Sequence, residues 1–188
     1  MNHIKKIFFI INIYLILLFN NINVEGKVVT LRNSDNSFDN IGSIIANNQN
    51  NKELIINLED EYYDMSKLSQ SFEFPIMTNI KLIGNNNGTV FDYKNKYRGI
   101  FNLKFAQNKN ETIIFENIIF NNLLDESGPS YEINIFFIEA SSDNFNLIFN
   151  NCLFQYNHGC ILRTESKCVK SSRTDDSAPI IFNNCNFL

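Results

Sequence analysis

The sequence has no excess of basic residues and no closely spaced cysteine pairs. It contains 16 Lys and Arg residues against 20 Asp and Glu residues, which gives a formal net charge of −4. Because nucleic-acid binding depends on many cationic contacts with phosphates, this balance argues against a nucleic-acid partner. The spacing of the four cysteines does not match that of zinc sites, and we expect neither a metal nor a cofactor.

Long apolar runs are also scarce, because the only one lies at the N-terminus. Residues 7–19 are apolar with one interruption, and they follow Lys5 and Lys6. This pattern is typical of a secretory signal peptide, here residues 1–26 with cleavage after Gly26. A membrane anchor is the alternative, but the run is shorter than the roughly 20 residues that span a bilayer. We therefore expect a secreted or cell-surface protein whose mature chain has no membrane span.

Export would permit two kinds of covalent modification. Asn87 and Asn110 each begin an Asn-x-Thr sequon, so both are candidate glycosylation sites that must then lie on the surface. Cys160 and Cys168 bracket a short loop. In an oxidising compartment they are candidates for a disulfide, and two free thiols are the alternative.

One short phrase recurs along the chain at a nearly fixed spacing. The three copies are residues 113–120 (IIFENIIF), 147–154 (LIFNNCLF) and 180–187 (IIFNNCNF). Their central residues Asn117, Asn151 and Asn184 lie 34 and then 33 residues apart, and residues 80–84 (IKLIG) form a weaker copy upstream. A fixed period of this length indicates a solenoid or a related repeat architecture.

The repeating unit is built from strands and not from helices. Apolar residues alternate within each copy, whereas helical repeats of similar length need two amphipathic helices. After the central asparagine the alternation changes phase, which an unbroken strand cannot do. The chain must therefore bend at Asn117, Asn151 and Asn184, because asparagine tolerates the left-handed conformation of such a corner. Gly84 is expected to play the same role in the earlier turn.

Two strands joined by an asparagine corner and stacked in parallel describe an all-β fold, the parallel β-helix. Like residues then lie about 4.8 Å apart on successive coils. We expect Asn117, Asn151 and Asn184 to form a ladder of amide hydrogen bonds. Cys152 and Cys185 share one register position, and we expect stacked core thiols because a stacked Cβ spacing near 4.8 Å exceeds that of ordinary disulfides.

A third strand in each coil completes the expected wall. The third strands are residues 99–104, 133–138 and, more weakly, 160–163. The alternation leaves Ile114, Ile148 and Ile181 facing outward. These three side chains are either covered by the connecting loops or form an apolar stripe used in contacts.

With these features the chain resembles the right-handed parallel β-helix proteins of the pectin-lyase-like superfamily. Residues 37–65 (SFDNIGSIIANNQNNKELIINLEDEYYDM) look like the entry that such proteins use. A short amphipathic helix from Phe38 to Ala46 would cover the first coil, followed by a strand from Leu54 to Leu58 and a tyrosine-bearing turn. We expect an N-terminal cap over residues 27–65 and coils over residues 66–188. The coils are expected to be incomplete, because the chain stops inside the repeated phrase.

The resemblance implies possible chemistry on acidic polysaccharides, but no catalytic residue can be assigned. The pair Asp175 and Asp176 and the lone His158 are similar to polygalacturonase motifs, although their order is reversed and the Arg-x-Lys of that family is missing. Solvated loop charge is the simpler interpretation. Four further carboxylates lie on or beside expected strands and could line a groove: Asp92, Glu116, Glu139 and Glu165.

The sequence therefore favours a non-catalytic module that is secreted or attached to the cell surface. Its expected partner is a polysaccharide or a cell-surface glycan, or else it serves as an adhesion scaffold. The alternative is a polysaccharide lyase or glycosidase whose active coils lie beyond residue 188.

Overall fold

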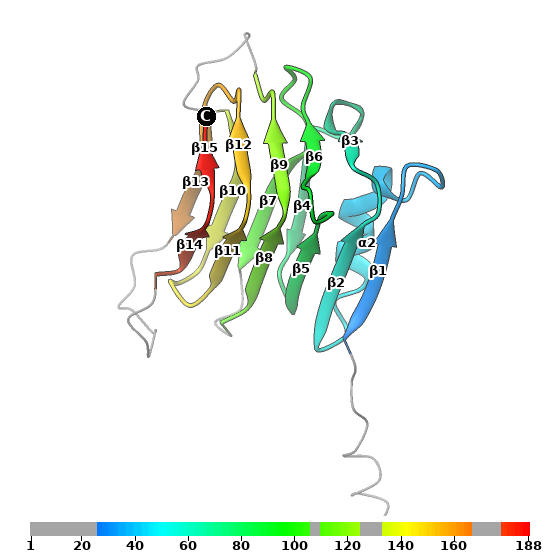
Figure 1. Cartoon of the computed structure of the whole chain (residues 1–188). Helices are drawn as coiled ribbons and strands as arrows, with labels where there is room; N and C mark the ends of the chain where they lie inside the picture. Colours follow the sequence, from blue (N-terminus) through cyan, green and yellow to red (C-terminus); the bar gives the residue numbers. More distant parts are fainter. Residues whose placement is uncertain (1–25, 106–109, 125–132, 167–177) are drawn as a thin grey trace, which may run out of the picture.

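The computed structural model describes residues 26–105, 110–124, 133–166 and 178–188. These residues form a parallel β-solenoid of about five turns (Figure 1). Nearly all of the expected signal peptide, residues 1–25, lies outside the described residues. The all-β parallel β-helix predicted from the repeated phrase is confirmed.

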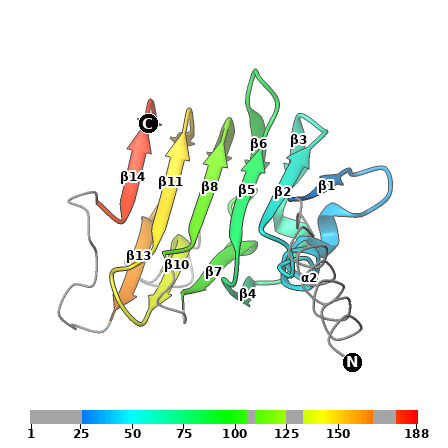
Figure 2. The same cartoon turned by 90° about the horizontal axis from the view of Figure 1, so that it is seen from below.

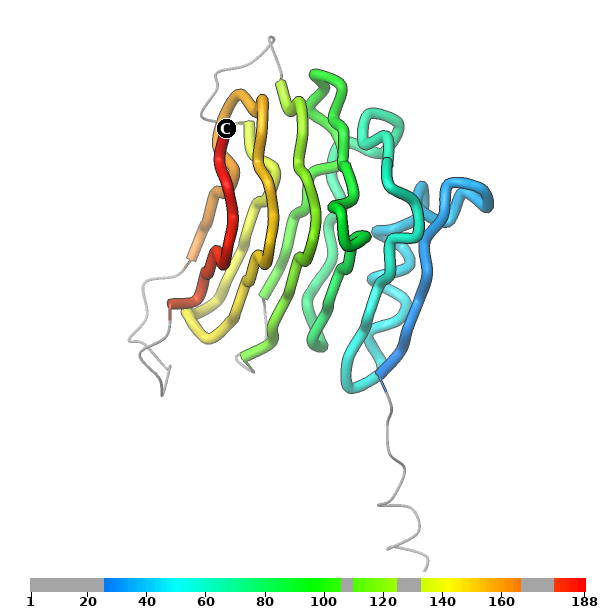
Figure 3. The backbone as a smooth tube through the Cα atoms, in the orientation of Figure 1, coloured from blue at the N-terminus to red at the C-terminus, as the bar shows by residue number. Residues whose placement is uncertain are grey.

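Three parallel sheets form the walls of the solenoid. Sheet 1 contains, in spatial order, β1 (Lys27–Leu31), β2 (Glu53–Leu58), β5 (Asn79–Ile83), β8 (Thr112–Glu116), β11 (Asn146–Asn150) and β14 (Ile180–Asn183). Sheet 2 contains β3 (Tyr62–Asp64), β6 (Thr89–Asp92), β9 (Ile118–Asn121), β12 (Leu153–Gln155) and β15 (Asn186–Phe187). Sheet 3 contains β4 (Ser71–Pro75), β7 (Ile100–Phe105), β10 (Asn134–Ala140) and β13 (Cys160–Ser166). From β2 onward the chain visits the three sheets in turn, so each complete coil adds one strand to each wall (Figure 3).

The strand register follows the repeated phrase residue by residue. Leu82 pairs with Phe115, Phe115 with Phe149, and Phe149 with Phe182. The rings stack in the same way, because the centroids of Phe149 and Phe182 lie 4.8 Å apart with planes 8° from parallel. Burying a side chain of this size stabilises the fold by roughly 1.5 to 3 kcal/mol. The phenylalanine column is therefore a main source of stability.

The three asparagine corners have the predicted backbone conformation. The φ angles of Asn117, Asn151 and Asn184 are 57°, 52° and 51°, which lie in the left-handed region. The backbone N–H of Asn117 donates to the carbonyl oxygen of Asn150 on the next coil at 3.0 Å. Each corner thus changes the side-chain phase of the chain while it keeps the coils hydrogen-bonded.

Gly84 occupies the matching corner for a different reason from the one predicted. Its φ angle is not in the positive region that Gly88 and Gly99 adopt. A Cβ atom at Gly84 would instead lie 2.2 Å from the carbonyl oxygen of Asn117 and 2.9 Å from Thr89 Oγ1. The expectation of a left-handed glycine was wrong, because close approach of the next coil is what requires glycine here.

An asparagine ladder links the corners of neighbouring coils. Asn151 Nδ2 donates to Asn117 Oδ1 at 3.4 Å, and Asn183 Nδ2 donates to Asn150 Oδ1 at 2.9 Å. The ladder-like arrangement is confirmed, and it has two columns. The shorter bond lies in the column on the outer face of sheet 1, one residue before the corners.

A short helical segment lies at the β1 and β2 end of the solenoid (Figure 2). It comprises the 3₁₀ turn η1 (Phe38–Asn40) and helix α2 (Ile41–Asn47). The predicted apolar face is confirmed, since Phe38, Ile41 and Ile45 are all buried. The residues expected to form a tyrosine-bearing turn instead form strand β3, which is followed by the 3₁₀ turn η2 (Met65–Lys67).

Strands β1 and β2 belong to the same sheet as the later coils. Leu54 of β2 pairs with Ile80 of β5, and Tyr63 of β3 pairs with Phe91 of β6. The residues expected to form the cap therefore already contribute strands to two walls of the solenoid.

Candidate functional site

The four strand carboxylates singled out from the sequence lie on three different walls. Asp92 is on sheet 2 and Glu116 is on sheet 1, where Lys81 Nζ lies 2.8 Å from Glu116 Oε2. Only Glu139 and Glu165 come together, because they are register partners on β10 and β13 of sheet 3. The candidate site is therefore built on the outer face of sheet 3.

Two rows of residues cross the outer face of sheet 3, one residue from each strand. The first row is Glu73, Asn102, Phe137 and Arg163, and the second is Pro75, Lys104, Glu139 and Glu165. Side chains two positions apart on one strand share a face, so the two rows lie side by side. We call this surface the sheet-3 face.

A charged depression of about 660 Å³ lies at the second row. Its lining comprises Lys104, Phe105, Glu139, Ala140, Ser141, Thr164, Glu165 and Ser166. Lys104 Nζ forms an ion pair with Glu73 and lies 3.4 Å from Glu139 Oε1. A hydrogen bond to Glu73 raises the pKa of Lys104, so the ammonium group stays charged. This part of the face suits a polar ligand with many hydroxyl groups.

A second, smaller depression of about 230 Å³ lies at the first row, and we call it the amide depression. Its lining comprises Gln70, Ser71, Tyr97, Ile100, Asn102, Asn134, Phe137 and Arg163. The guanidinium carbon of Arg163 lies 5.4 Å from the centroid of the Phe137 ring. Cation–π contact holds the arginine over the aromatic ring at the rim.

Two side-chain amides in the amide depression lack hydrogen-bond partners. Asn134 is only 3% exposed, and its Nδ2 atom has no partner. The Oδ1 atom of the half-buried Asn102 is likewise buried and unpartnered. Buried polar atoms are nearly always paired in folded proteins. Tyr93 Oη, Asn121 Oδ1 and both carboxylate oxygens of Glu111 are likewise buried without a partner, so the lack of a partner does not by itself mark a site.

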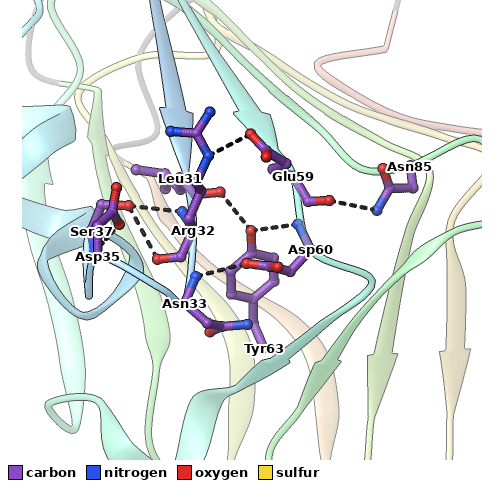
Figure 4. Close-up of polar contacts among 9 residues, drawn as sticks. All are labelled: Leu31, Arg32, Asn33, Asp35, Ser37, Glu59, Asp60, Tyr63 and Asn85. Atoms are coloured by element: carbon purple, nitrogen blue, oxygen red, sulfur yellow. Dashed lines mark hydrogen bonds and ion pairs between the residues drawn. The ribbon is translucent and has the colours of Figure 1, made fainter.

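In the polar cluster at the N-terminal end, the buried hydroxyl of Tyr63 has hydrogen-bond partners, and the cluster stabilises the fold (Figure 4). Tyr63 Oη donates to the carbonyl oxygen of Leu31 at 2.7 Å and accepts from the backbone N–H of Asp60 at 3.1 Å. Arg32 Nε pairs with Glu59 Oε2 at 2.6 Å. These bonds fasten the end of β1 to the first coil. Burial raises the pKa of Tyr63 to about 12, so the hydroxyl stays protonated.

The structure describes three of the four cysteines, Cys152, Cys160 and Cys185. Cys152 is buried, Cys185 is half-buried, and both thiols are free. Burial raises the pKa of Cys152 to about 12, which makes its thiolate inaccessible near neutral pH. Cys160 is an exposed free thiol, but Cys168 lies outside the described residues, so the expected pairing remains a prediction.

The remaining candidates from the sequence either line neither depression or lie outside the described residues. His158 is exposed, and its backbone N–H donates to the carbonyl oxygen of Leu123 at 2.7 Å. Asp175 and Asp176 lie outside the described residues. The sequon residues Asn87 and Asn110 are both exposed, and Asn110 Oδ1 accepts from Asn146 Nδ2 at 2.9 Å.

Within residues 26–105, 110–124, 133–166 and 178–188, no group of three or more His, Cys, Asp or Glu side chains is arranged to hold a metal ion. None of the helices in those ranges combines the length and hydropathy needed to cross a bilayer.

Sequence reasoning missed Asn102, Asn134 and Phe137 as site residues. The strands of residues 99–104, 133–138 and 160–163 do not share a recurring phrase, so the sequence does not display their register. Aligning them on their inward phenylalanines, Phe101 and Phe136, would have placed Asn102 beside Phe137. The depth of the depressions depends on neighbouring strands and was not visible from any one segment.

Comparison of the chain with protein-family models, with curated proteins and with solved structures gives no match.

Proposed function

We propose that this protein is a secreted or cell-surface β-helix module that binds glycans without cleaving them. The binding surface is the sheet-3 face, where the charged depression and the amide depression lie side by side. Protein–ligand sites commonly combine apolar or aromatic walls with a few convergent polar groups. The sheet-3 face has that combination in Phe137, Arg163 and the amides of Asn102 and Asn134.

The observation that carries this proposal is the aromatic and cationic wall of the amide depression, where the guanidinium carbon of Arg163 lies 5.4 Å from the centroid of the Phe137 ring. An aromatic wall beside charged hydrogen-bonding groups suits a ligand that has both an apolar face and hydroxyl groups, as a sugar ring has. The coil architecture supports the proposal further, because the face is a rigid surface on paired strands.

Export and glycosylation belong to the same proposal. The N-terminal apolar run directs the chain out of the cell, and Asn87 and Asn110 are exposed and accessible for glycan attachment. Neither sequon residue lines either depression. A fall in apparent mass after enzymatic removal of N-linked glycans would verify the modification. Membership of the pectin-lyase-like superfamily is a finer part of the proposal, and it rests on the coil pattern.

Direct binding measurements test the proposal. The exported protein should bind at least one polysaccharide or cell-wall fraction in a pull-down, and calorimetry should then give an affinity. Phe137→Ala and Arg163→Ala should each weaken binding about tenfold or more, because both remove a wall of the amide depression. Lys81→Ala, on the outer face of sheet 1, is the matched control and should bind normally. Failure to bind any polysaccharide or cell-surface fraction would contradict the proposal.

A second function is favoured by one observation, the register pairing of Glu139 with Glu165. Hydrolysis of a glycosidic bond uses two carboxyl groups about 5 to 9.5 Å apart, a range that side chains on neighbouring strands can reach. The sequence-based alternative places lyase or glycosidase activity in coils beyond residue 188. Release of reducing or unsaturated sugar ends would support an enzyme. Loss of that release in Glu139→Gln and Glu165→Gln would assign it to this face instead of to later coils.

A further inference from the structure

Ion pairs join all the charged residues that the two rows place on the sheet-3 face. The rows contain three carboxylates and two cations: Glu73, Glu139, Glu165, Lys104 and Arg163. Lys104 Nζ forms an ion pair with Glu73 and lies 3.4 Å from Glu139 Oε1. Arg163 Nη2 lies 2.9 Å from Glu165 Oε1. A carboxylate of a ligand could therefore pair with a cation of these rows only by displacing a carboxylate of the protein.

The surplus of negative charge lies at the charged depression. Glu139 and Glu165 are register partners on β10 and β13, so their backbones lie about 4.8 Å apart. Both line the charged depression, together with Lys104. Since Lys104 is already shared with Glu73, a ligand carboxylate that enters the depression meets more negative than positive charge. Like charges brought together at an interface oppose binding.

The same groups keep enough hydrogen-bonding capacity to bind uncharged hydroxyl groups. A carboxylate has about four lone-pair sites, and a guanidinium has several N–H donors. The bond between Arg163 Nη2 and Glu165 Oε1 uses only part of that capacity. A hydroxyl group both donates and accepts, so neighbouring sugar hydroxyls can bond to the carboxylate and to the guanidinium together. The Phe137 ring beside this guanidinium adds an apolar surface for the C–H groups of a sugar.

We infer that the sheet-3 face selects uncharged polysaccharides over polymers of uronic acids, and that Glu139 and Glu165 set this selectivity. Glu165 occupies the guanidinium of Arg163, the group best suited to bind a uronate carboxylate. Glu139 supplies the second negative charge at the depression. This inference rests on the proposed glycan-binding function and specifies the class of glycan. It departs from the acidic polysaccharides that the resemblance to the pectin-lyase-like superfamily implies.

Two pairs of soluble polymers that differ in charge test the inference. The first pair is methyl-esterified homogalacturonan and the same polymer after removal of the esters, and the second is hydroxyethyl cellulose and carboxymethyl cellulose. In each pair that the protein binds, calorimetry should show about tenfold or more tighter binding of the uncharged polymer. Equal or tighter binding of an acidic polymer, or binding of none of the four, would overturn the inference. Only the absence of binding to every polysaccharide and cell-surface fraction would overturn the proposed function as well.

Two carboxylate variants should gain binding to an acidic polymer, a result that damage to the fold cannot produce. Glu165→Gln frees the guanidinium of Arg163, so its affinity for unesterified homogalacturonan should rise about tenfold or more. Glu139→Gln removes a negative charge but frees Lys104 only from its 3.4 Å contact, so its gain should be smaller. Because glutamine still donates and accepts hydrogen bonds, both variants should bind the uncharged polymers within about threefold of the unmodified protein.

Glu116→Gln is the matched control, since it removes a carboxylate from sheet 1, where Glu116 Oε2 lies 2.8 Å from Lys81 Nζ. It changes the net charge of the protein as much as Glu165→Gln does but leaves the sheet-3 face intact, so its affinities should not change. An equal gain in both variants would assign the selectivity to the net charge of the whole chain. No gain in Glu165→Gln would assign it to other residues. Either result would overturn the inference.

Discussion

The coil that contains β11 and β12 and the one that contains β14 and β15 have nearly the same phrase, but they differ in burial. Phe149 is 0% exposed, whereas its register partner Phe182 is 38% exposed. Phe154 is 1% exposed, and its partner Phe187 is 53% exposed. Both coils bend through a left-handed asparagine with almost the same φ angle. The local sequence therefore sets the backbone path, and burial comes from the strands stacked on either side.

The same comparison explains why the phrase is repeated. In the inner coil each phenylalanine has a ring above and a ring below, since Phe149 stacks on Phe115 at 5.4 Å and on Phe182 at 4.8 Å. Within the described residues, Phe182 has a stacked partner on one side only. One-dimensional stacking of this kind makes stability a sum of contributions from neighbouring repeats.

The largest predicted effect is the loss of stability on truncating Phe149, which we compare with the truncation of its stacked partner Phe182. Phe149→Ala removes a fully buried ring and should lower the free energy of unfolding by about 3 to 5 kcal/mol. Phe182→Ala removes a partly exposed ring and should lower it by under about 1.5 kcal/mol. Denaturant titration of both variants measures the difference. Equal losses would mean that the two coils are equally packed in solution, and the comparison would fail.

A second prediction concerns the corners, where Gly84 and Asn117 act differently. Gly84→Ala places a Cβ atom 2.2 Å from the carbonyl oxygen of Asn117, so the coils must separate. The free energy of unfolding should fall by about 1 to 3 kcal/mol. Asn117→Gly keeps the left-handed conformation and loses only the 3.4 Å ladder bond from Asn151, so it should lower the free energy of unfolding by less than about 1 kcal/mol. If the two variants were equally stable, close approach at the first corner would not be the reason for glycine.

These corners also show what could and could not be predicted from the sequence. The bends at Asn117, Asn151 and Asn184 were predictable, because a change of side-chain phase is visible within a single segment. The role of Gly84 was not, because it depends on the carbonyl oxygen of Asn117 from the next coil.

The candidate site was less predictable for the same reason. Asn102 and Asn134 each look like an ordinary residue of a strand, and nothing in either segment signals a missing partner. Only the stacking of β7 beside β10 brings them to one depression. Glu139 and Glu165 were recognised as carboxylates near strands, yet their pairing required the register of sheet 3.

A third prediction follows from the burial of Cys152 in the inner coil. Burial raises its pKa from 9.0 to about 12, so the unfolded chain loses this proton at a lower pH than the folded protein does. The stabilising contribution is complete below pH 9 and declines as the pH rises toward 12. The slope is about 1.4 kcal/mol per pH unit for one group. Free energies of unfolding between pH 8.5 and 10 should show it, below the range in which Tyr63 contributes.

Two variants separate the effect of ionising the Cys152 thiol from the effect of the volume that its side chain fills. Cys152→Ala should lower stability at neutral pH and flatten the decline above pH 9. Leu147→Ala creates a cavity in the same coil without removing a titrating group, so its curve should run parallel to that of the unmodified protein. A decline in Cys152→Ala as steep as in the unmodified protein would assign the pH dependence to other groups.

The smallest predicted effect lies on the exposed ladder that joins the two compared coils. Asn183 Nδ2 donates to Asn150 Oδ1 at 2.9 Å, and water competes for both groups. Asn183→Ala should therefore lower the free energy of unfolding by only about 0.5 to 1 kcal/mol. Asn33→Ala, which removes one exposed side-chain hydrogen bond at the other end of the solenoid, is the comparison variant. A loss from Asn183→Ala as large as that from Phe149→Ala would show that the amide ladder, and not the phenylalanine column, holds the coil of β14 and β15 in register.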